Sequence, residues 1–328
     1  MRTSRGSALL SVLWLSAALA AIAFSLSTTV RGETERASTG VDGLRSYYLA
    51  VGAIQRARIE LLWSVLKPNE RVIPKGATYV DYEFPSGMAR VEFIPEASKL
   101  NVNGLPVQDL YRLIMALGVQ PARAMEVATA IDDWRRPPEG GGSRFDGHYL
   151  SLTPSFQARH ASLEEIEELL LVQGVTPDLF YGTYVPSEDY SAENPGSGPR
   201  LTRRYGLFDC LSVYGTKDRV DANTAMPPVL LTIGLNPYAI SALLERRQVK
   251  PLTEKELGEF MASVGASAER LRTEGNAVLT LRATARLLQP DGRLSDLRRT
   301  VSALMKYMQP GADSPVDILR WYDTAWSN

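Results

Sequence analysis

The carboxylates best suited to chemistry in this sequence lie in one short stretch. Asp132 and Asp133 are followed by Glu139 and Asp146, and glycines occupy positions 140–142 between them. Calcium binds roughly six to eight oxygen atoms, so this stretch is a candidate calcium site, although its spacing matches no EF-hand loop. The alternative, which we favour, is that the two aspartates pair with arginines at a helix end; the available arginines are Arg135, Arg136 and Arg144.

No constellation of residues indicates catalysis. The two histidines, His148 and His160, have no partner implied by spacing, and we expect both at the surface. The single cysteine, Cys210, excludes an intrachain disulfide and any metal site built of several cysteines, and its apolar neighbours predict a buried thiol. No nucleophile elbow, phosphate-binding loop or dinucleotide fingerprint is present. The sequence therefore predicts a protein that is not an enzyme.

The overall charge of the chain is close to neutral. Its 36 Lys+Arg and 37 Asp+Glu residues give a net charge of −1, which argues against a dedicated nucleic-acid-binding protein. A chain of 328 residues, 45% of them hydrophobic, can fill the core of one large domain or two ordinary ones. The charge is unevenly spread, because no charged residue occurs between Arg5 and Arg31.

The uncharged stretch 7–30 is long enough to cross a membrane. A helix rises about 1.5 Å per residue, so this stretch spans a hydrocarbon core of roughly 30 Å. Two arginines before it provide the positive flank that keeps the N-terminus in the cytoplasm. Three interpretations remain: a secretory signal cleaved after Ala20 or Ala23, a signal anchor, or a pilin-type leader that is cut between Gly6 and Ser7 and leaves the helix in place.

The segment behind the apolar stretch keeps helical spacing. No proline occurs before Pro68, and apolar residues between Leu44 and Val65 recur every three or four positions with charged residues between them. A signal peptide has no need of this amphipathic second half, so the pattern favours a retained helix. Glycine destabilises a helix interior by about 1 kcal/mol, and the glycines in the segment 32–43 predict a bend or break there.

Alternating patterns predict strands at both ends of the remaining chain. Residues 79–84 and 88–94 alternate around a Pro-Ser-Gly turn, which predicts a β-hairpin. Near the C-terminus, strands are predicted at 278–288, 297–305 and 317–322. An apolar run predicts a further strand at 207–213 that joins the same sheet.

The middle of the chain, about 100–265, is predicted to be helical. Amphipathic spacing predicts helices at 107–117, 122–134, 163–172, 238–247 and 254–263. Residues 187–204 are rich in Ser, Pro and Gly and predict an exposed loop. Helices flanked by strands that must pair predict an α+β fold, with an α-domain inserted into a domain that contains the sheet.

One turn pattern, Gly-aliphatic-polar-Pro, occurs three times, beginning at Gly118, Gly174 and Gly234. Glycine can adopt the left-handed conformation that ends a helix, a polar residue caps the next helix, and proline fits its first turn. Each copy therefore predicts a helix, a tight turn and a second helix. Thr176 and Asn236 are good caps for the helices that follow.

Helical hairpins also occur in proteins that bind DNA, where N–H groups at the turn contact phosphates. The turns of this chain lack the Gly-x-Gly sequence and flanking basic residues of such modules, and residues 163–171 contain four glutamates. Because such a surface repels phosphate, we expect no nucleic-acid partner. A membrane-anchored helix-hairpin-helix protein for DNA binding or uptake remains the alternative function, and a cell-surface hydrolase has no supporting residue.

Four features occur in order along nearly the whole chain. The first is a basic leader that ends in Gly6 and precedes Ser-Ala-Leu-Leu-Ser, and the second is the stretch Lys99–Asn103, which leads through the first hairpin to Asp132-Asp133-Trp134. The third is the stretch Leu163–Val175, and the fourth is Val220–Ala225 with the proline-led helix that follows it. Together these features resemble general secretion pathway protein K, the family of large minor pseudopilins in type II secretion systems.

The resemblance implies an α+β fold with a long N-terminal membrane-spanning helix, a pilin-like α/β body with an antiparallel sheet, and a large inserted all-α domain built of helix-turn-helix units. The implied division is a cleaved leader (1–6), the transmembrane part of the helix (7–30), its amphipathic continuation with the first strands (31–98), the inserted α-domain (99–205), and a C-terminal part (206–328). The C-terminal part would hold a helical segment, about 220–265, and the remaining strands.

The resemblance also implies chemistry at the N-terminus. Prepilin peptidase would cleave after Gly6 and methylate the new amine on Ser7. Most pilin-like subunits carry a glutamate at the fifth mature position, where it neutralises the N-terminal ammonium of a neighbour; a carboxylate in hydrocarbon is costly unless paired. That position is Ser11 in this chain, and the K family is known for lacking the glutamate. A subunit without that glutamate loses the pairing with a subunit ahead of it.

The implied function is that of a non-enzymatic assembly protein of the bacterial inner membrane. It would cross the membrane once, with its N-terminus cytoplasmic and most of the chain periplasmic. There it would cap the pseudopilus tip with minor pseudopilins I and J, and H, above a filament of major pseudopilin G, and initiate assembly for protein export. Calcium is the one cofactor to consider, because some members bind it, but Arg135-Arg136-Pro137-Pro138 replaces the expected acidic run.

Overall fold

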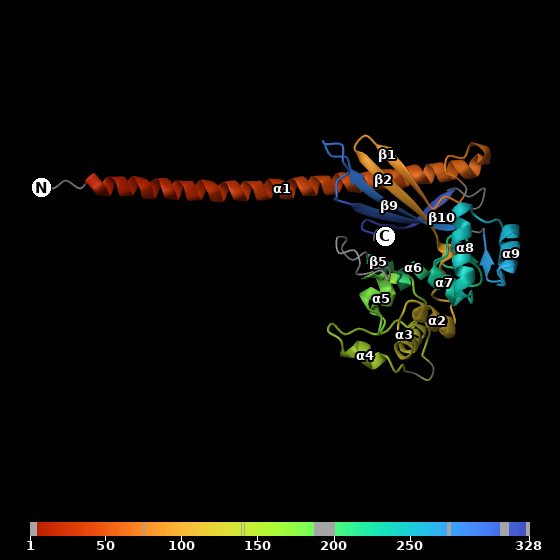
Figure 1. Ribbon diagram of the computed structural model, residues 1–328. Coiled ribbons are helices and arrows are strands. Elements are labelled where there is room, and N and C mark those ends of the chain that lie inside the picture. Colours follow the sequence, from red (N-terminus) through yellow and green to blue (C-terminus); the bar gives the residue numbers. More distant parts are fainter. Residues whose placement is uncertain are drawn as a thin grey trace, which may run out of the picture.

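The computed structural model of the chain describes residues 5–74, 76–138, 140, 142–186, 201–273, 277–308 and 315–325. Figure 1 shows three parts: a long N-terminal helix, α1 (Arg5–Leu66), a sheet beside its C-terminal part, and a helical body across the sheet from α1. The N-terminal part of α1 projects away from the other two. This α+β arrangement confirms the predicted fold class.

α1 is one uninterrupted helix of 62 residues. The predicted bend or break near residues 32–43 is therefore wrong. Gly32 and Gly40 lie where nothing packs against the helix, so the absent side chains leave no void. Ion pairs one turn apart, such as Arg36–Glu33 at 2.8 Å, support the helix in this region. Each glycine still costs about 1 kcal/mol, but stable helix on both sides outweighs that cost.

Five antiparallel strands form the sheet in the order β1-β2-β9-β10-β11. Their bounds are β1 Tyr79–Phe84, β2 Gly87–Pro95, β9 Val278–Leu287, β10 Arg299–Tyr307 and β11 Val316–Tyr322. The predicted strands at both ends of the chain are confirmed. β2 and β9 pair directly, with Val91 opposite Ala283, so the sheet closes over the long segment between them.

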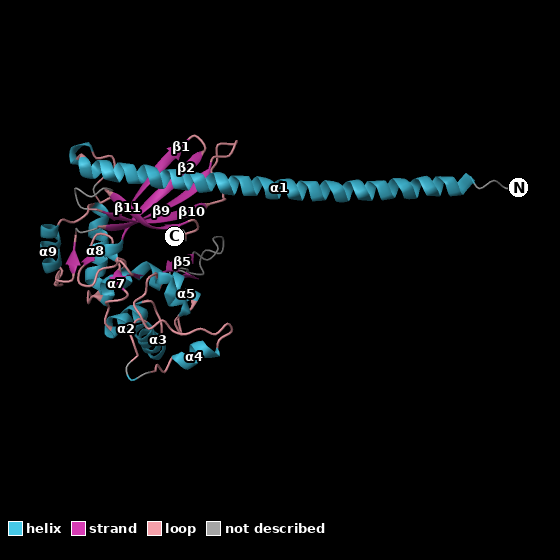
Figure 2. Cartoon of the chain, turned by 180° about the vertical axis from the view of Figure 1, so that it is seen from behind, coloured by secondary structure: helices cyan, strands magenta, loops and turns pink. Residues whose placement is uncertain are grey.

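α1 covers one face of the sheet through small side chains (Figure 2). Ala50, Ala53 and Ala57 of the helix are fully buried, as is Ile54. The strands contribute Ala89, Val91, Ala283, Ala285, Val301 and Ala303 to the same cluster. The alanines on both surfaces let helix and sheet approach closely, and larger side chains such as Phe93 and Leu281 fill the rest of the cluster and exclude water.

The helical body is built from the residues between β2 and β9. Its helices are α2 (Val107–Ala116), α3 (Pro121–Trp134), α4 (Asp146–Ser151), α5 (Pro177–Tyr181), α6 (Leu207–Cys210), α7 (Pro227–Thr232), α8 (Pro237–Val249) and α9 (Glu254–Ser263). Short 3-10 turns lie at Pro68–Glu70, Glu96–Ser98 and Ile166–Leu171. The short strands pair as β3 (Leu100–Asn101) with β6 (Leu211–Ser212), β4 (Thr183–Pro186) with β5 (Leu201–Arg204), and β7 (Val220–Asp221) with β8 (Leu271–Arg272).

A single apolar cluster runs through this body from Leu100 to Leu271. The segment 220–265, which the sequence analysis grouped with the C-terminal strands, packs in the same cluster as α2 and α3. In packing terms, the whole chain between β2 and β9 forms one helical body.

The three glycine turns adopt the predicted geometry. Gly118, Gly174 and Gly234 have φ angles of +83°, +84° and +100°, the left-handed region that glycine favours. The Thr176 hydroxyl accepts a hydrogen bond from the Leu179 N–H, and the Asn236 side chain accepts one from the Ala239 N–H. The helix–turn–helix prediction is therefore confirmed at Gly118 and Gly234, whereas at Gly174 a 3-10 turn takes the place of the first helix.

The predicted helix at 163–172 is wrong, because only the 3-10 turn Ile166–Leu171 forms there. The Glu168 carboxylate folds back and accepts hydrogen bonds from the N–H groups of Glu164 (2.6 Å) and Glu165 (3.1 Å). These bonds occupy donors at the start of the segment and close a tight turn, so no full α-helix develops.

Two further predictions change in the segment before β6. Residues 207–213 do not join the large sheet: they form α6 and β6, and the Asp209 carboxylate closes the first turn of α6 by accepting from the Gly206 N–H at 2.9 Å. A short apolar run does not distinguish a buried helical turn from a strand. Cys210 is fully buried, as predicted, but on this helix. Within the predicted loop 187–204, residues 201–204 form β5, and 187–200 lie outside the described residues.

The helical body contains two units of similar construction. Each begins with a two-residue parallel ladder, β3 with β6 or β7 with β8, followed by a turn, a helix, a glycine turn and a second helix. Asn101 Oδ1 accepts from the Asn103 N–H, and Asp221 Oδ1 accepts from the Asn223 N–H, both at 3.0 Å. The amides of Asn103 and Asn223 then each bond both backbone groups of one leucine, namely Leu163 and Leu252.

An arginine closes each unit, and it is buried in the first unit and half-buried in the second. Arg135, after α3, donates to the carbonyls of Val102 and Leu105, and Arg247, in α8, donates to those of Ala222 (3.1 Å) and Ala225 (2.8 Å). Each guanidinium therefore ties the end of the second helix to the turn that precedes the first.

Candidate functional site

The N-terminal part of α1 is suited to cross a membrane. Within the described residues, α1 is the one helix that is long and apolar enough, with a mean hydropathy of 2.2 in its best window and no part of that window buried. Gly6 and Ser7 lie in the first turn of α1, and Ser11 lies in a following turn on an exposed surface. The predicted cleavage and methylation positions are thus at the tip of the projecting helix.

A charged segment separates this apolar part from the sheet. Residues 31–42 are almost entirely exposed and include Arg31, Glu35 and the Arg36–Glu33 ion pair. Twelve helical residues span about 18 Å. The sheet and the helical body therefore stand away from the apolar end of the helix.

α1 is apolar on two opposite faces where it passes the sheet. One face is buried against the strands, as described above. The other carries Val41, Leu44, Tyr48, Ile59 and Leu66, which are 49%, 57%, 64%, 61% and 68% exposed. Their spacings of 3, 4, 11 and 7 residues place them along one line of the helix. We call these five residues the outer face of α1.

The outer face has the properties of a helix-docking surface. Gly52 lies between Tyr48 and Ile59 and has nothing within 4 Å of its missing side chain, so the backbone is accessible to a close neighbour. A helix that is apolar on both sides is normally covered on both sides. The apolar residues whose spacing predicts α1 include those of the outer face. The sequence does not show which apolar side of the helix is buried, because that depends on where the sheet packs.

The carboxylates predicted as calcium ligands are engaged by basic side chains. Asp132 pairs with Arg135 at 2.5 Å and with Arg136 at 3.1 Å. Asp146 Oδ1 lies 2.9 Å from His160 Nε2, and the other ring nitrogen of His160 lies 3.1 Å from the Asp133 carbonyl. Among the described residues, no three acidic, histidine or cysteine side chains gather as a metal site.

The three candidates that the structure describes, Asp132, Asp133 and Asp146, are therefore already engaged by neighbouring side chains. Glu139, the fourth candidate, lies outside the described residues. The hydrogen bond from His160 lowers the pKa of Asp146. Burial opposes protonation of His160, but its bonds to Asp146 and the Asp133 carbonyl outweigh burial and raise its pKa. The alternative favoured from the sequence was that these aspartates pair with arginines, and this is confirmed for Asp132, which pairs with Arg135 and Arg136.

Sequence reasoning missed the role of His160. It was expected at the surface without a partner, yet it links Asp146 to the end of α3. His160 adopts a φ of +48°, unusual for a residue other than glycine, and this conformation aims the ring at both partners. No spacing rule connects residues 146 and 160, so no sequence signal was available.

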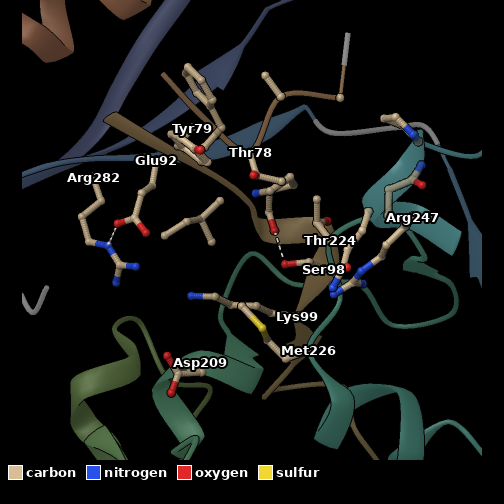
Figure 3. Close-up of a pocket in the computed structure, with 18 of the residues that line it drawn as sticks. Thr78, Tyr79, Glu92, Ser98, Lys99, Asp209, Thr224, Met226, Arg247 and Arg282 are labelled. Atoms are coloured by element: carbon tan, nitrogen blue, oxygen red, sulfur yellow. Dashed lines mark hydrogen bonds and ion pairs between the residues drawn. The ribbon is translucent and has the colours of Figure 1, made fainter. Parts of the chain in front are cut away.

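A groove lies between the helical body and the face of the sheet that α1 leaves uncovered. That face carries polar residues: Glu92, Thr280, Arg282, Thr284, Thr300 and Ser302. Cavities of about 580 and 320 Å³ share Ile94, Lys99, Phe208 and Arg282. In the larger cavity (Figure 3), the Lys99 side chain points between Arg282 and Asp209. The sequence did not predict this groove, because distant strands and turns form it.

Three comparisons relate this chain to known proteins. The family described as "Type II secretion system (T2SS), protein K" matches residues 96–182, from the 3-10 turn after β2 into the residue after α5. The type II secretion system protein K of Klebsiella pneumoniae is 25% identical over 196 residues, or 54% of this chain, and the match spans 60% of that relative's length.

A solved structure shares the fold. It is a chain of the GspK-GspI-GspJ complex from the type 2 secretion system of enterotoxigenic Escherichia coli, with a TM-score of 0.52 and 16% identity. The likeness covers 87% of this chain and 98% of that one. The matched domain, the curated relative and the shared fold agree in that each relates this chain to protein K of type II secretion systems.

Proposed function

We propose that the chain is a minor pseudopilin that forms the tip of a periplasmic pseudopilus and initiates its assembly for protein export, without enzymatic activity. The observation that carries the proposal is the outer face of α1, an exposed apolar line along the sheet-bound part of the same helix whose N-terminal part can cross a membrane. A subunit that assembles through its N-terminal helix needs such a face.

The proposed partners are the minor pseudopilins I and J, together with H and the major pseudopilin G. The fold relative was solved in a complex named GspK-GspI-GspJ, which supports the first two. Tyr48 and Ile59 on the outer face offer large apolar contacts for a neighbouring helix, and Gly52 between them allows a close approach.

The proposal places the helix in the bacterial inner membrane with the N-terminus cytoplasmic. Prepilin peptidase would remove residues 1–6 and methylate Ser7, and the charged segment 31–42 would lie just outside the membrane. Ser11 would leave this subunit without the carboxylate that pairs with the N-terminal amine of a subunit ahead of it, as expected at a tip.

The test is a double substitution on the outer face, Tyr48→Arg with Ile59→Arg, in the full chain. Two buried cations at a helix–helix contact should lower co-purification with I and J of the same secretion system at least about tenfold. The thermal unfolding of the variant should match the wild type, because both side chains are mostly exposed.

Thr39→Arg is the matched control, since Thr39 is exposed on α1 on the side opposite the outer face. It should leave co-purification unchanged. Retention of both partners by the double variant would contradict the proposed interface, and equal loss in the control would show that any added charge on α1 acts in the same way.

A further inference from the structure

The smaller cavity of the groove, about 320 Å³, contains a lysine whose hydrogen-bonding capacity is unused. The Lys99 side chain is 11% exposed, and its Nζ lies 3.9 Å from Glu96 Oε1, beyond hydrogen-bond distance. That oxygen already accepts from the Thr280 hydroxyl at 2.7 Å. Within the described part of the chain, no acceptor bonds the ammonium, which lies 5.0 Å from the centre of the Phe208 ring.

A carboxylate oxygen in the same cavity is also unpartnered. Glu167 Oε2 is buried and has no hydrogen-bond partner among the described residues. No ion pair joins it to Lys99, although both line the cavity. A buried donor and a buried acceptor that do not satisfy each other each carry an unfavourable desolvation cost.

Further polar groups form one row across the floor of the cavity. Arg282 is opposite Ser302 on β10, which is opposite Tyr322 on β11. The Arg282 side chain is 6% exposed and bonds Glu92 through Nε alone at 2.7 Å, among the described contacts. Burial, followed by nearby glutamates, raises the pKa of Tyr322 to about 12, so its hydroxyl remains a donor at neutral pH.

We propose that this cavity binds a short extended peptide segment, whose main-chain carbonyl accepts from Lys99 and whose N–H donates to Glu167. An extended peptide presents both groups along one edge and projects alternate side chains to either side. Leu211, Val213 and Leu304 line the cavity and provide apolar surface for those side chains.

The charges of the cavity select a neutral ligand that both donates and accepts. An anion would approach the Glu167 and Glu96 carboxylates, and a cation would approach Lys99 and Arg282. The remaining charges are already paired, with Arg320 and Glu165 at 2.7 Å on the rim. The amide unit matches the two unsatisfied groups without adding a net charge, and a cavity of this size lies at the lower end of ligand pockets, which begin near roughly 300 Å³.

The probe is acetyl-trialanine N-methylamide, titrated onto the full chain in detergent and followed by saturation-transfer NMR. The comparison ligand is its depsipeptide analogue, in which the central N–H is replaced by oxygen. Wild type should bind the peptide and bind the depsipeptide about tenfold more weakly, because Glu167 then has no donor to accept from. This comparison needs no variant and is unaffected by folding defects.

Two variants locate the site. Lys99→Met and Glu167→Leu should each weaken peptide binding about tenfold, and Glu167→Gln should retain it because its amide oxygen still accepts. Lys255→Met is the control, since Lys255 is 87% exposed on α9, and it should bind as wild type does. Three results would each overturn the proposal. The wild type would show no saturable binding of the peptide, or it would bind the depsipeptide with equal affinity, or it would bind the sugar maltotriose in place of the peptide.

Discussion

Individual charged side chains decide the character of the loop after α3. Arg135 and Arg136 pair with Asp132, and His160 bonds Asp146, so basic groups of the chain neutralise carboxylates that resemble metal ligands in sequence. The arginine contacts could be predicted, because they lie three and four residues away on one helix end. The histidine contact could not, because it depends on a left-handed backbone conformation 14 residues beyond Asp146.

Glu167 provides a pH-dependent prediction at this scale. Burial, and then Glu165, raises its pKa, while Lys99 and Arg320 oppose the shift. A raised carboxyl pKa means that the folded state binds more protons than the unfolded state, so stability should fall as pH rises from the unfolded pKa through the folded one. Glu167→Gln should remove this loss and stabilise the protein by about 1 kcal/mol at pH 8, the lower end of the cost of an unsatisfied buried group.

Urea unfolding of the full chain in detergent between pH 4 and pH 8 measures the effect. Glu259→Gln serves as its control, because Glu259 is exposed on α9 and has no buried oxygen to relieve. An unchanged pH slope in Glu167→Gln would show that Glu167 is ionised in the folded state without a penalty.

At the scale of elements, repeated local patterns specify repeated structure. The Gly-x-x-Pro turns predicted three helix–turn–helix units; all three glycines adopt the expected conformation, and two of the units have α-helices on both sides of the turn. The lead-ins Lys99–Asn103 and Val220–Ala225 share Asn or Asp at equivalent positions, and these make equivalent turns. Arg135 and Arg247 close the two units in the same way, but the sequence did not reveal this. The two arginines follow their lead-ins at different separations along the chain, so no shared spacing marks them.

Substitution of the closing arginine should destabilise its unit strongly. Arg135→Met leaves two buried carbonyls without a donor and removes a partner of Asp132, so a loss of about 3 kcal/mol in unfolding free energy is expected. Arg247→Met should lose about 2 kcal/mol, because two carbonyls but no hydrogen-bonded carboxylate are affected.

Denaturant unfolding monitored by tryptophan fluorescence reports this difference. The neighbouring variant Arg136→Met, whose side chain is 60% exposed, should change stability by less than about 0.5 kcal/mol. If Arg135→Met behaved like Arg136→Met, the closing bonds would have no role in stability.

At the scale of the whole molecule, one helix connects two environments. The first part of α1 is apolar on all sides and packs against nothing, whereas its last third is held by the sheet. The helical body lies on the far side of that sheet and leaves the outer face of α1 open. The helical body of this chain therefore does not cover the surface through which we propose that it assembles.

Processing of the N-terminus should be visible in the mass of the whole protein. When the chain is expressed with the prepilin peptidase of its secretion system, the purified protein should begin at Ser7 and lack residues 1–6. Loss of Arg2 and Arg5 changes the net charge from −1 to −3. A start after Ala20 or Ala23 would instead show cleavage as a secretory signal, and Gly6→Asp should leave the leader attached if the peptidase reads this position.

The sequence by itself determined the local features of this protein: the uncharged helix, the strands with alternating patterns, and the glycine turns. These depend on periodicity and backbone preference within a few residues. Tertiary structure decided the rest, because short apolar runs such as 207–213 are ambiguous until their neighbours are placed. Pairing of β2 with β9 created the groove, and packing of α1 on the sheet determined which apolar side of the helix is buried and which is left for a partner. Burial is a property of the assembled molecule, and no local pattern contains it.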